Sequence, residues 1–431
     1  MATPLVVAIE MGYGHLRAAE PLARLLGTQV LHADRPPLAD ADEQRLWGEA
    51  RRFYELGSRL SQVPIVGAPL RQALDALTYI PHLHPYRDLS GPTASARAVE
   101  RFAKRGLGHG LADRLRASGE ALLTTFFTPA VIADRHGCDH VYCVVTDADI
   151  NRVWAPFDAR ASRVRYFAPS VRAERRLRSY GVPEAHIRYT GFPLPHELLG
   201  GPGLPVLKRN LAGRLVRLDP SKVFRGHYRD ELGHFLGALP AGEEGRPPLV
   251  TFAIGGAGAQ VGLVRQFLPG FRPLLAGGKI RLALVAGVRP EVNAALSQAV
   301  AEAGLTSCLG DTIEILHVGD MPGYFERFNA LLARTDILWT KPSELTFFGA
   351  LGLPLVLATP MGVHERYNRR WAREAGAGLK QRDARHAAEW LLDWLADGTL
   401  AGAAWNGFMR LPKFGLYQIL ETFGVQVPDE T

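Results

Sequence analysis

The residues best suited to chemistry lie in segment 336–370, where two short apolar runs are each followed by polar side chains. Residues 337–339 and 355–357 are typical of buried parallel strands, because both runs are continuously apolar. Loops that leave the carboxyl ends of neighbouring parallel strands meet at one crevice, so we expect residues 342–346 and 359–368 to lie side by side. A helix start donates N–H groups to a phosphate, and a carboxylate accepts hydrogen bonds from sugar hydroxyls, so a sugar nucleotide suits this pattern. The candidate ligand-binding residues are Lys341, Pro342, Ser343, Glu344, Leu345, Thr346, His364, Glu365 and Asn368.

A second candidate site follows the first apolar run of the chain. Residues 4–9 predict a buried strand, which leads through Gly12 and Gly14 to His15 and into a helical repeat over residues 16–26. Glycines let the backbone approach a ligand closely, and a histidine in the first helical turn can act as a general base. The alternative is that His15 only caps the turn.

An acid follows the predicted strand 141–145. Asp147 is expected to face the same crevice as His15 and to orient it. Asp147 and Asp149 also form an Asp-x-Asp pair, a pattern that can hold a metal-bound diphosphate. One such pair is close to chance in a chain with 43 acidic residues, so we expect neither a metal nor a cofactor.

The second half of the chain opens as the first half does. Residues 249–254 predict a strand, and a helix is expected over 261–268. The glycine-rich turn between them can cradle a diphosphate with its backbone N–H groups. The residues expected to do so are Gly255, Gly256 and Gly258.

These repeats predict two α/β domains and a C-terminal helix. Residues 1–197 form the first domain, with a proline-interrupted helical insertion over 43–116, and residues 249–407 form the second. Residues 198–248 are punctuated by Gly and Pro and predict an inter-domain stretch with one helix inside it, over about 228–239. Residues 408–431 predict a helix that returns to the first domain. The apolar insertion suits an apolar acceptor or a lipid surface, but an ordinary helical layer on the sheet would explain it equally well.

Composition narrows the class of protein. A chain of 431 residues is long enough for two domains of roughly 200 residues. The net charge of +7 allows contact with an anionic membrane surface, while no nucleic-acid motif accompanies it, so no nucleic-acid partner is expected. Three cysteines at unrelated spacings predict neither disulfides nor a zinc site. No signal peptide or run of about 18 apolar residues is seen, which predicts a cytoplasmic protein, peripheral at the inner face of the membrane.

Taken in order, the motifs resemble those of the GT-B glycosyltransferases. The likeness is closest to the branch of monogalactosyldiacylglycerol synthases and of the N-acetylglucosaminyltransferases of lipid II synthesis. It spans nearly the whole chain and rests on Gly12-Tyr13-Gly14-His15, Val145-Thr146-Asp147, Tyr166-Phe167-Ala168-Pro169-Ser170, Gly181-Val182-Pro183, Gly191-Phe192-Pro193, Gly255-Gly256-Ala257-Gly258, Thr340-Lys341-Pro342, Gly352-Leu353-Pro354, His364-Glu365 and Asn368. The resemblance implies two Rossmann-like α/β/α domains that face each other across a cleft, the first binding the acceptor and the second the nucleotide sugar.

One departure from the family pattern lies at the donor site. The family has two glycines after Lys-Pro and then a Glu in the helix, whereas this chain has Ser343-Glu344 followed by Phe347-Phe348. We expect Glu344 to substitute for the missing acid, and the end of the pocket that holds the uracil or the sugar to be altered.

The resemblance implies inverting, metal-independent transfer of a hexose or N-acetylhexosamine from a nucleoside diphosphate sugar, expected to be a UDP-sugar, to a hydroxyl group of a lipid or other acceptor. His15 is the expected base, and the Gly255–Gly258 turn and the helix start at Ser343 are expected to stabilise the leaving diphosphate. Two alternatives stay open: a nucleotide-sugar epimerase or hydrolase on the same scaffold, and a non-catalytic protein that binds nucleotide sugars.

Overall fold

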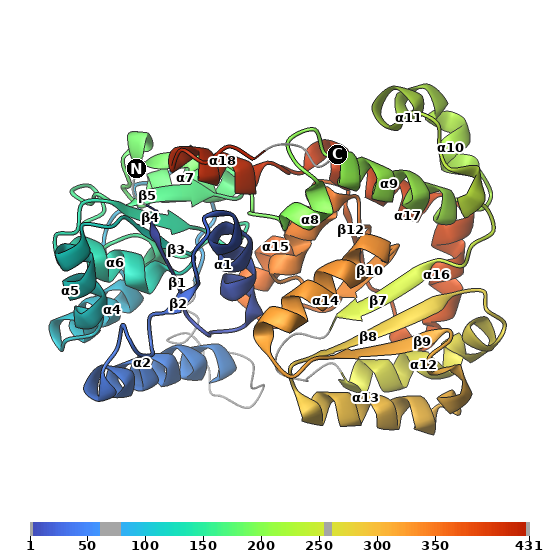
Figure 1. Ribbon diagram of the computed structural model, residues 1–431, viewed down its shortest axis with the longest axis horizontal. Helices are drawn as coiled ribbons and strands as arrows, with labels where there is room; N and C mark the ends of the chain where they lie inside the picture. Colours follow the sequence, from blue (N-terminus) through green and yellow to red (C-terminus); the bar gives the residue numbers. More distant parts are fainter. Residues whose placement is uncertain (1–2, 61–78, 254–260, 428–431) are drawn as a thin grey trace. The chain divides into compact units, whose positions relative to one another are not determined.

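The computed structural model describes residues 3–60, 79–253 and 261–427, which fall into two compact units. The first unit contains residues 3–194 together with 361–368 and 412–426, and the second contains 195–360 and 369–411. Each unit is built on a parallel six-stranded sheet with helices around it (Figure 1). This is the α/β architecture that the sequence predicts.

The sheet of the first unit has the strand order β2-β1-β3-β4-β5-β6, and every neighbouring pair is parallel. The order reverses between β1 and β3, so the loops after these two strands flank the point where open α/β sheets bind ligands. The elements of this unit are β1 (Leu5–Ala8), α1 (Tyr13–Leu25), β2 (Leu31–His32), α2 (Ala41–Leu60), α4 (Ala94–Lys104), α5 (His109–Ser118), β3 (Leu122–Thr124), α6 (Phe127–Arg135), β4 (Val141–Val144), η1 (Arg152–Trp154), β5 (Arg165–Ala168), α7 (Val171–Ser179), η2 (Glu184–His186), β6 (Ile187–Tyr189) and α18 (Gly415–Thr422).

The central strands β1, β3 and β4 of this sheet are buried on both faces. All four residues of β1 are buried, as a continuous apolar run in a parallel sheet predicts. Leu5 and Val7 belong to a core shared with α2, α4, α5, α6 and α7, while Tyr142 of β4 contacts Phe423, just after α18, with ring centroids 5.0 Å apart. The C-terminal helix therefore packs on the first unit, as expected, and Arg188 donates to Glu421 at 2.7 Å.

The sheet of the second unit has the strand order β12-β11-β10-β7-β8-β9. Counted from β7, this is the order 6-5-4-1-2-3 of a dinucleotide-binding fold, with its reversal between β7 and β10. Its elements are α8 (His196–Leu199), α9 (Pro205–Arg217), α10 (Val223–His227), α11 (Arg229–Leu236), η3 (Ala241–Glu243), β7 (Leu249–Ala253), α12 (Val261–Ala276), β8 (Arg281–Gly287), α13 (Pro290–Glu302), η4 (Thr306–Cys308), β9 (Ile313–His317), α14 (Met321–Arg334), β10 (Ile337–Thr340), η5 (Glu344–Leu351), β11 (Leu355–Leu357), β12 (Gly378–Lys380), η6 (Ala384–His386), α16 (Ala387–Ala396) and α17 (Thr399–Arg410), while α15 (Val363–Glu374) begins in the first unit and ends in the second.

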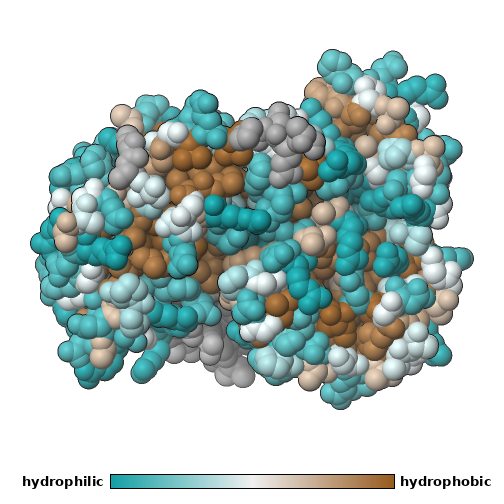
Figure 2. Space-filling model, viewed as in Figure 1, coloured by the Kyte–Doolittle hydropathy of each residue, from teal (hydrophilic) through white to brown (hydrophobic). Residues whose placement is uncertain are grey.

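Two stretches differ from the sequence-based expectation. Residues 198–248, expected to link the domains, contain α9, α10 and α11 and cluster with the second unit. Within the insertion expected to be helical over 43–116, residues 79–93 contain no helix, and residues 61–78 lie outside the described residues. Val223 on α10 and Phe235 on α11 are exposed apolar side chains, and Figure 2 shows apolar surface over this helical pair at its upper right.

A buried arginine on α9 holds two segments of the second unit together. Arg214 of α9 is 1% exposed and donates to the backbone carbonyls of Thr335, Leu351 and Gly352 at 2.7, 2.8 and 3.1 Å. Burial lowers its pKa to about 10, so it remains protonated at neutral pH. This cation holds the end of η5 against the loop before β10.

In residues 3–60, 79–253 and 261–427 no helix combines the length and apolar character needed to cross a bilayer. The three cysteines are free and buried.

Acid should destabilise the first unit through His136. Its Nε2 is buried without a hydrogen-bond partner among the described residues, and its ring packs edge-on against that of His109 at 4.9 Å. Burial, followed by the charges of His109, Arg116 and Arg135, lowers the pKa of His136 below 6.5, while Asp113 opposes the shift. The unfolded chain therefore binds more protons below pH 6.5, and the free energy of unfolding should fall as the pH drops from 6.5 through the folded-state pKa.

Urea unfolding of the wild type and of His136→Gln at pH 7.5 and 5.5 measures this effect. The variant should lose less stability on acidification than the wild type, while His140→Gln, at an exposed position nearby, should behave like the wild type. Equal losses in all three proteins would contradict the assignment.

Candidate functional site

His15 lies where the loops after β1 and β3 meet, at the reversal point of the first sheet. Gly12 precedes α1 with φ of 94°, a left-handed conformation that side chains rarely adopt, so a glycine is needed to turn the chain from β1 into the helix. The turn places His15 in the first turn of α1, partly exposed. The sequence predicted this position.

Hydrogen bonds at Nδ1 hold the His15 ring. Its Nδ1 lies 2.8 Å from the carbonyl oxygen of Thr125 and 3.2 Å from Oγ1 of Thr146, and Thr125 Oγ1 donates to the His15 carbonyl at 2.9 Å. A carbonyl oxygen only accepts, so Nδ1 carries the proton, and in the neutral ring Nε2 then carries the lone pair. This is the tautomer that a base acting through Nε2 requires.

Aromatic rings pack around the same imidazole. The ring of Phe126 meets that of His15 edge-on at 4.7 Å, and the ring of Trp154 lies tilted at 6.4 Å. Both aromatic side chains are buried. They fix the plane of the imidazole from the side, while Thr125 and Thr146 fix its rotation.

Asp147 has a different partner from the one the sequence predicted. Its Oδ1 accepts from Nδ2 of Asn368 at 3.0 Å, and Oδ1 of Asn368 accepts from the N–H of Ala148 at 2.8 Å. The two residues that hold Nδ1 of His15 are Thr125 and Thr146, which the sequence analysis did not single out. Their positions after β3 and β4, at the carboxyl ends of two adjacent strands, are the signal that could have identified them.

The second acid of the Asp-x-Asp pair is engaged in an ion pair. Asp149 has no exposed surface, and Arg176 donates to its two oxygens at 2.9 and 3.0 Å. Burial alone would lower the pKa of Arg176, but its hydrogen bonds to Asp149 and the charge of that carboxylate outweigh burial and raise it. With Arg176 on both oxygens, Asp149 is not arranged as a metal ligand.

The predicted ligand-binding residues are divided between the two units. Lys341, Pro342, Ser343, Glu344, Leu345 and Thr346 belong to the second unit, and His364, Glu365 and Asn368 cluster with the first. Strands β10 and β11 are parallel neighbours, with Thr340 opposite Leu357, so the loops that follow them leave the same edge of the sheet. The turn Gly255–Gly258 lies outside the described residues.

The segment after Pro342 is a 3-10 helix, η5, where a helix was expected. Its first turn begins at Glu344, and both the N–H and Oγ1 of Thr346 donate to the Ser343 carbonyl, at 3.0 and 2.8 Å. Ser343 and Glu344 are partly exposed, whereas Leu345 and Thr346 are buried. Only the beginning of η5 is thus open to a ligand.

Residues 363–368, expected to belong to a polar loop, instead form the beginning of helix α15, and two of them make hydrogen bonds within the chain. Glu365 is 3% exposed and its Oε2 accepts from the N–H of Met361 at 2.7 Å, before α15. Asn368 has no exposed surface and uses both amide atoms on Asp147 and Ala148. His364 is exposed.

With two parallel six-stranded sheets and their surrounding helices, the chain has the GT-B fold. No protein family model matches the chain, and no curated protein sequence matches it.

The solved structures that are similar to it include those of three proteins. One is a Listeria monocytogenes protein assigned as a UDP-N-acetylglucosamine 2-epimerase, with 13% identity, 100% of each chain covered and a TM-score of 0.51. The second is the Neisseria meningitidis UDP-GlcNAc 2-epimerase bound to UDP-GlcNAc, with 11% identity, 97% of this chain and 98% of the other covered, and a TM-score of 0.50. The third is S. aureus MnaA with UDP, with 10% identity, 98% of each chain covered and a TM-score of 0.50. At identities of 10 to 13%, these similarities show the fold alone.

Proposed function

We propose that the protein is an inverting glycosyltransferase that moves a hexose or N-acetylhexosamine from a UDP-sugar to a hydroxyl group of a lipid acceptor. The observation that carries the proposal is the state of His15, whose Nδ1 donates to the Thr125 carbonyl at the reversal point of the first sheet. This arrangement supports a base that takes a proton on Nε2.

In the proposed reaction, Nε2 of His15 takes the proton of the acceptor hydroxyl as its oxygen attacks the anomeric carbon. The bond from that carbon to the diphosphate breaks, and UDP leaves with the bonding electron pair. The N–H groups at the start of η5 and the turn Gly255–Gly258 would stabilise the negative charge on the leaving group. No step requires a metal ion, and Asp149 with Arg176 gives the Asp-x-Asp pair a structural role.

The donor side of the proposal rests on the second unit. Its strand order is that of dinucleotide-binding folds, and two of the similar solved structures hold UDP-GlcNAc or UDP. We assign Lys341 and Ser343 to the diphosphate and Glu344 to ribose or sugar hydroxyls. Glu365 and Asn368 lie in α15, where their polar atoms bond to Met361, Asp147 and Ala148, so we assign them a supporting role for the segment before that helix.

A lipid acceptor and contact with an anionic membrane surface are part of the proposal. The net charge of +7 supports them, as do Tyr79 and Tyr86, which lie in the insertion 43–116 and are 54% and 65% exposed.

An epimerase is the second candidate, because the three similar structures described above include proteins named as epimerases. The carboxylates near the first loop that could serve such a reaction are Glu10 and Asp147. Glu10 pairs with Arg35, and Asp147 accepts from Asn368. These contacts favour the transferase.

Calorimetry with UDP, GDP, dTDP and their sugar conjugates, with and without Mg²⁺, tests the donor site. We expect one uridine nucleotide to bind saturably without Mg²⁺. Glu344→Ala should weaken binding of the conjugate about tenfold or more, because a hydrogen bond to a charged group is lost, whereas Glu326→Ala on the exposed face of α14 should not. Absence of binding by every nucleotide would overturn the proposal, and consumption of the UDP-sugar without any acceptor would favour the epimerase.

A further inference from the structure

One loop of the first unit holds the polar side of the candidate base. Residues 146–150 follow β4, and Oγ1 of Thr146 lies 3.2 Å from Nδ1 of His15. Each of the next four residues is fastened by a hydrogen bond to a side chain from another part of the chain. Asp147, Ala148, Asp149 and Ile150 are held by Asn368, Ser170, Arg176 and Tyr180, respectively. The position of Thr146 against His15 therefore depends on these contacts.

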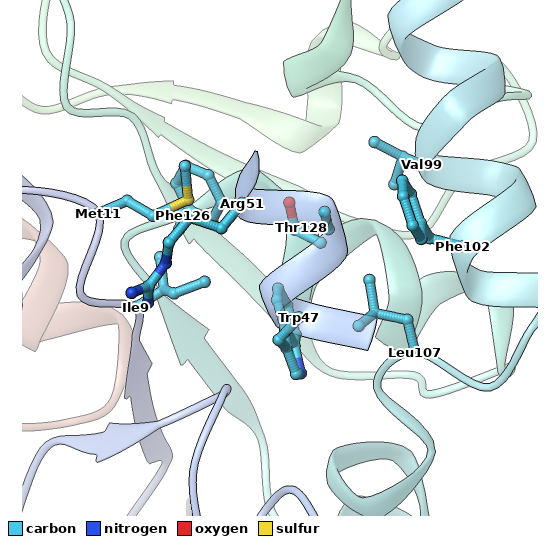
Figure 3. A pocket seen from close by; sticks show the side chains of 10 residues that line it. Ile9, Met11, Trp47, Arg51, Val99, Phe102, Leu107, Phe126 and Thr128 are labelled. Carbon is cyan, nitrogen blue, oxygen red and sulfur yellow. The ribbon is translucent and has the colours of Figure 1, made fainter. Parts of the chain in front are cut away.

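The aromatic side of the same imidazole has little room to move. Phe126, whose ring meets that of His15 at 4.7 Å, also lines a narrow pocket with Met11 and Trp47 (Figure 3). This pocket leaves the centre of a water molecule only about 10 Å³, which is space for roughly one water molecule. Phe126 thus has little free volume beside it, so the placement of the imidazole is more easily changed from the polar side, through Thr146.

Asn368 makes two of the hydrogen bonds that hold this loop. The residue has no exposed surface, its Oδ1 accepts from the N–H of Ala148 at 2.8 Å, and its Nδ2 donates to Oδ1 of Asp147 at 3.0 Å. An amide supplies both the acceptor and the donor that this pair of partners needs. The two bonds fix the two residues that directly follow Thr146, so Asn368 acts on the part of the loop nearest to His15.

Helix α15 connects Asn368 to the loop that follows β11. Glu365 lies three residues earlier on the same face of α15, and its Oε2 accepts from the N–H of Met361 at 2.7 Å. Met361 belongs to the loop after β11, which leaves the same edge of the second sheet as the loop that carries Lys341. The first turns of α15 therefore join this loop to the one that holds Thr146.

We propose that Asn368 is a positioning residue for His15. It fixes residues 146–148 so that Thr146 stays against Nδ1 of the imidazole, and through the first turns of α15 it makes this contact respond to a ligand at the loop after β11. The role of that response in sugar transfer rests on the proposed function, whereas the positioning of His15 by Asn368 does not.

An exchange of the two polar groups tests the positioning. In protein labelled with ¹⁵N at its 14 histidines, the ring signals of His15 are those lost in His15→Gln. Asn368→Asp sets a carboxylate against that of Asp147, so the loop should shift, and the Nδ1 signal of His15 should move in the direction seen in Thr146→Val. Adding Asp147→Asn to Asn368→Asp restores one donor and one acceptor, and should return the signal to its wild-type position.

Asn329 provides the matched control. It lies in the second unit, is 3% exposed, and donates from Nδ2 to Oε1 of Glu197 at 2.9 Å. Asn329→Asp therefore sets two carboxylates against each other in the same way, and should destabilise the protein without moving the His15 signal. Asn368→Ala removes both bonds without adding a charge, and serves if Asn368→Asp does not fold. An unchanged His15 signal in the folded Asn368 variants would overturn the proposal.

Titration with UDP tests the connection through α15. Saturating UDP should move the Nδ1 signal of His15 in the wild type, and this movement should be lost in Asn368→Ala, although calorimetry should still show UDP binding to the variant. Equal movement in both proteins would overturn the connection. If UDP does not bind to the wild type, the proposed function and the connection both fail, while the exchange between Asn368 and Asp147 still decides whether Asn368 positions His15.

Discussion

His15→Ala should lower the turnover of sugar transfer by about 10²–10⁴-fold while leaving the affinity for the UDP-sugar unchanged. The lost group is the proposed base, and the residues assigned to the donor lie elsewhere, most of them in the second unit. Single-turnover rates and nucleotide titration on the same preparations separate the two quantities. The limb of the pH–rate profile that reports the base should disappear in the variant.

The hydrogen bonds at Nδ1 make this prediction specific. Thr146→Val removes the 3.2 Å contact but keeps the Thr125 carbonyl at 2.8 Å, so the same tautomer persists. We therefore expect Thr146→Val to reduce turnover by less than His15→Ala and to retain the pH limb that His15→Ala loses. His15→Gln, which keeps a polar side chain but supplies no base, should resemble His15→Ala.

Wild-type turnover in His15→Ala would exclude His15 as the base. A protein that binds UDP-sugar but shows no turnover in the wild type would be the non-catalytic alternative. Turnover of the donor alone, lost in the variant, would identify an epimerase or hydrolase that uses the same histidine.

Much of the fold could be predicted from the sequence because its central strands are buried on both faces. Continuous apolar runs predicted β1, β7, β10 and β11, and the glycine turn after β1 predicted the start of α1. The edge strand β12 was not predicted, since it has three residues and only the first is fully buried. Short edge strands carry little of the apolar pattern that identifies the others.

Residues 198–248 were predicted to link the two domains, because the Gly and Pro residues that lie at helix ends there resemble those of a linker. Gly200 follows α8 with a positive φ of 79°, and Pro205 is the first residue of α9. Both are favoured at these positions because a left-handed residue ends a helix and a proline at the first position loses no hydrogen bond. The Gly and Pro residues at 200–205 were interpreted as part of an inter-domain stretch, whereas they mark the junction of α8 and α9.

The candidate site was only partly predictable. The position of His15 follows from its motif, but its partner is the backbone carbonyl of Thr125, 110 residues away. Every residue has a backbone carbonyl, so the residue type at position 125 could not indicate this contact. Asp147 was interpreted as the orienting acid because an acid at a strand end is a visible signal. In the structure, Thr125 and Thr146 contact Nδ1 of His15, whereas Asp147 is hydrogen-bonded to Asn368.

Asp149→Asn should destabilise the first unit by about 3–5 kcal/mol. Asp149 and Arg176 both have side chains with no exposed surface, and the guanidinium donates to both carboxylate oxygens. An amide in place of the carboxylate leaves a cation buried without its counter-ion, and one N–H donor loses its acceptor. Urea unfolding followed by circular dichroism measures the loss.

Variants of the neighbouring acid, Asp147, and of the ion-pair partner, Arg176, provide the controls. Asp147→Asn keeps an oxygen that can accept from Asn368, so it should cost no more than about 1 kcal/mol. Arg176→Met alone should destabilise the first unit as strongly as Asp149→Asn, because it leaves a buried carboxylate unpaired. The combination of Asp149→Leu with Arg176→Met should recover much of this loss, since the double variant buries no charge. Additive losses in the double variant would mean that the pair does not act as a unit. If Asp149→Asn instead folded as stably as the wild type and lost a Mg²⁺-dependent activity, the Asp-x-Asp pair would be a metal site after all.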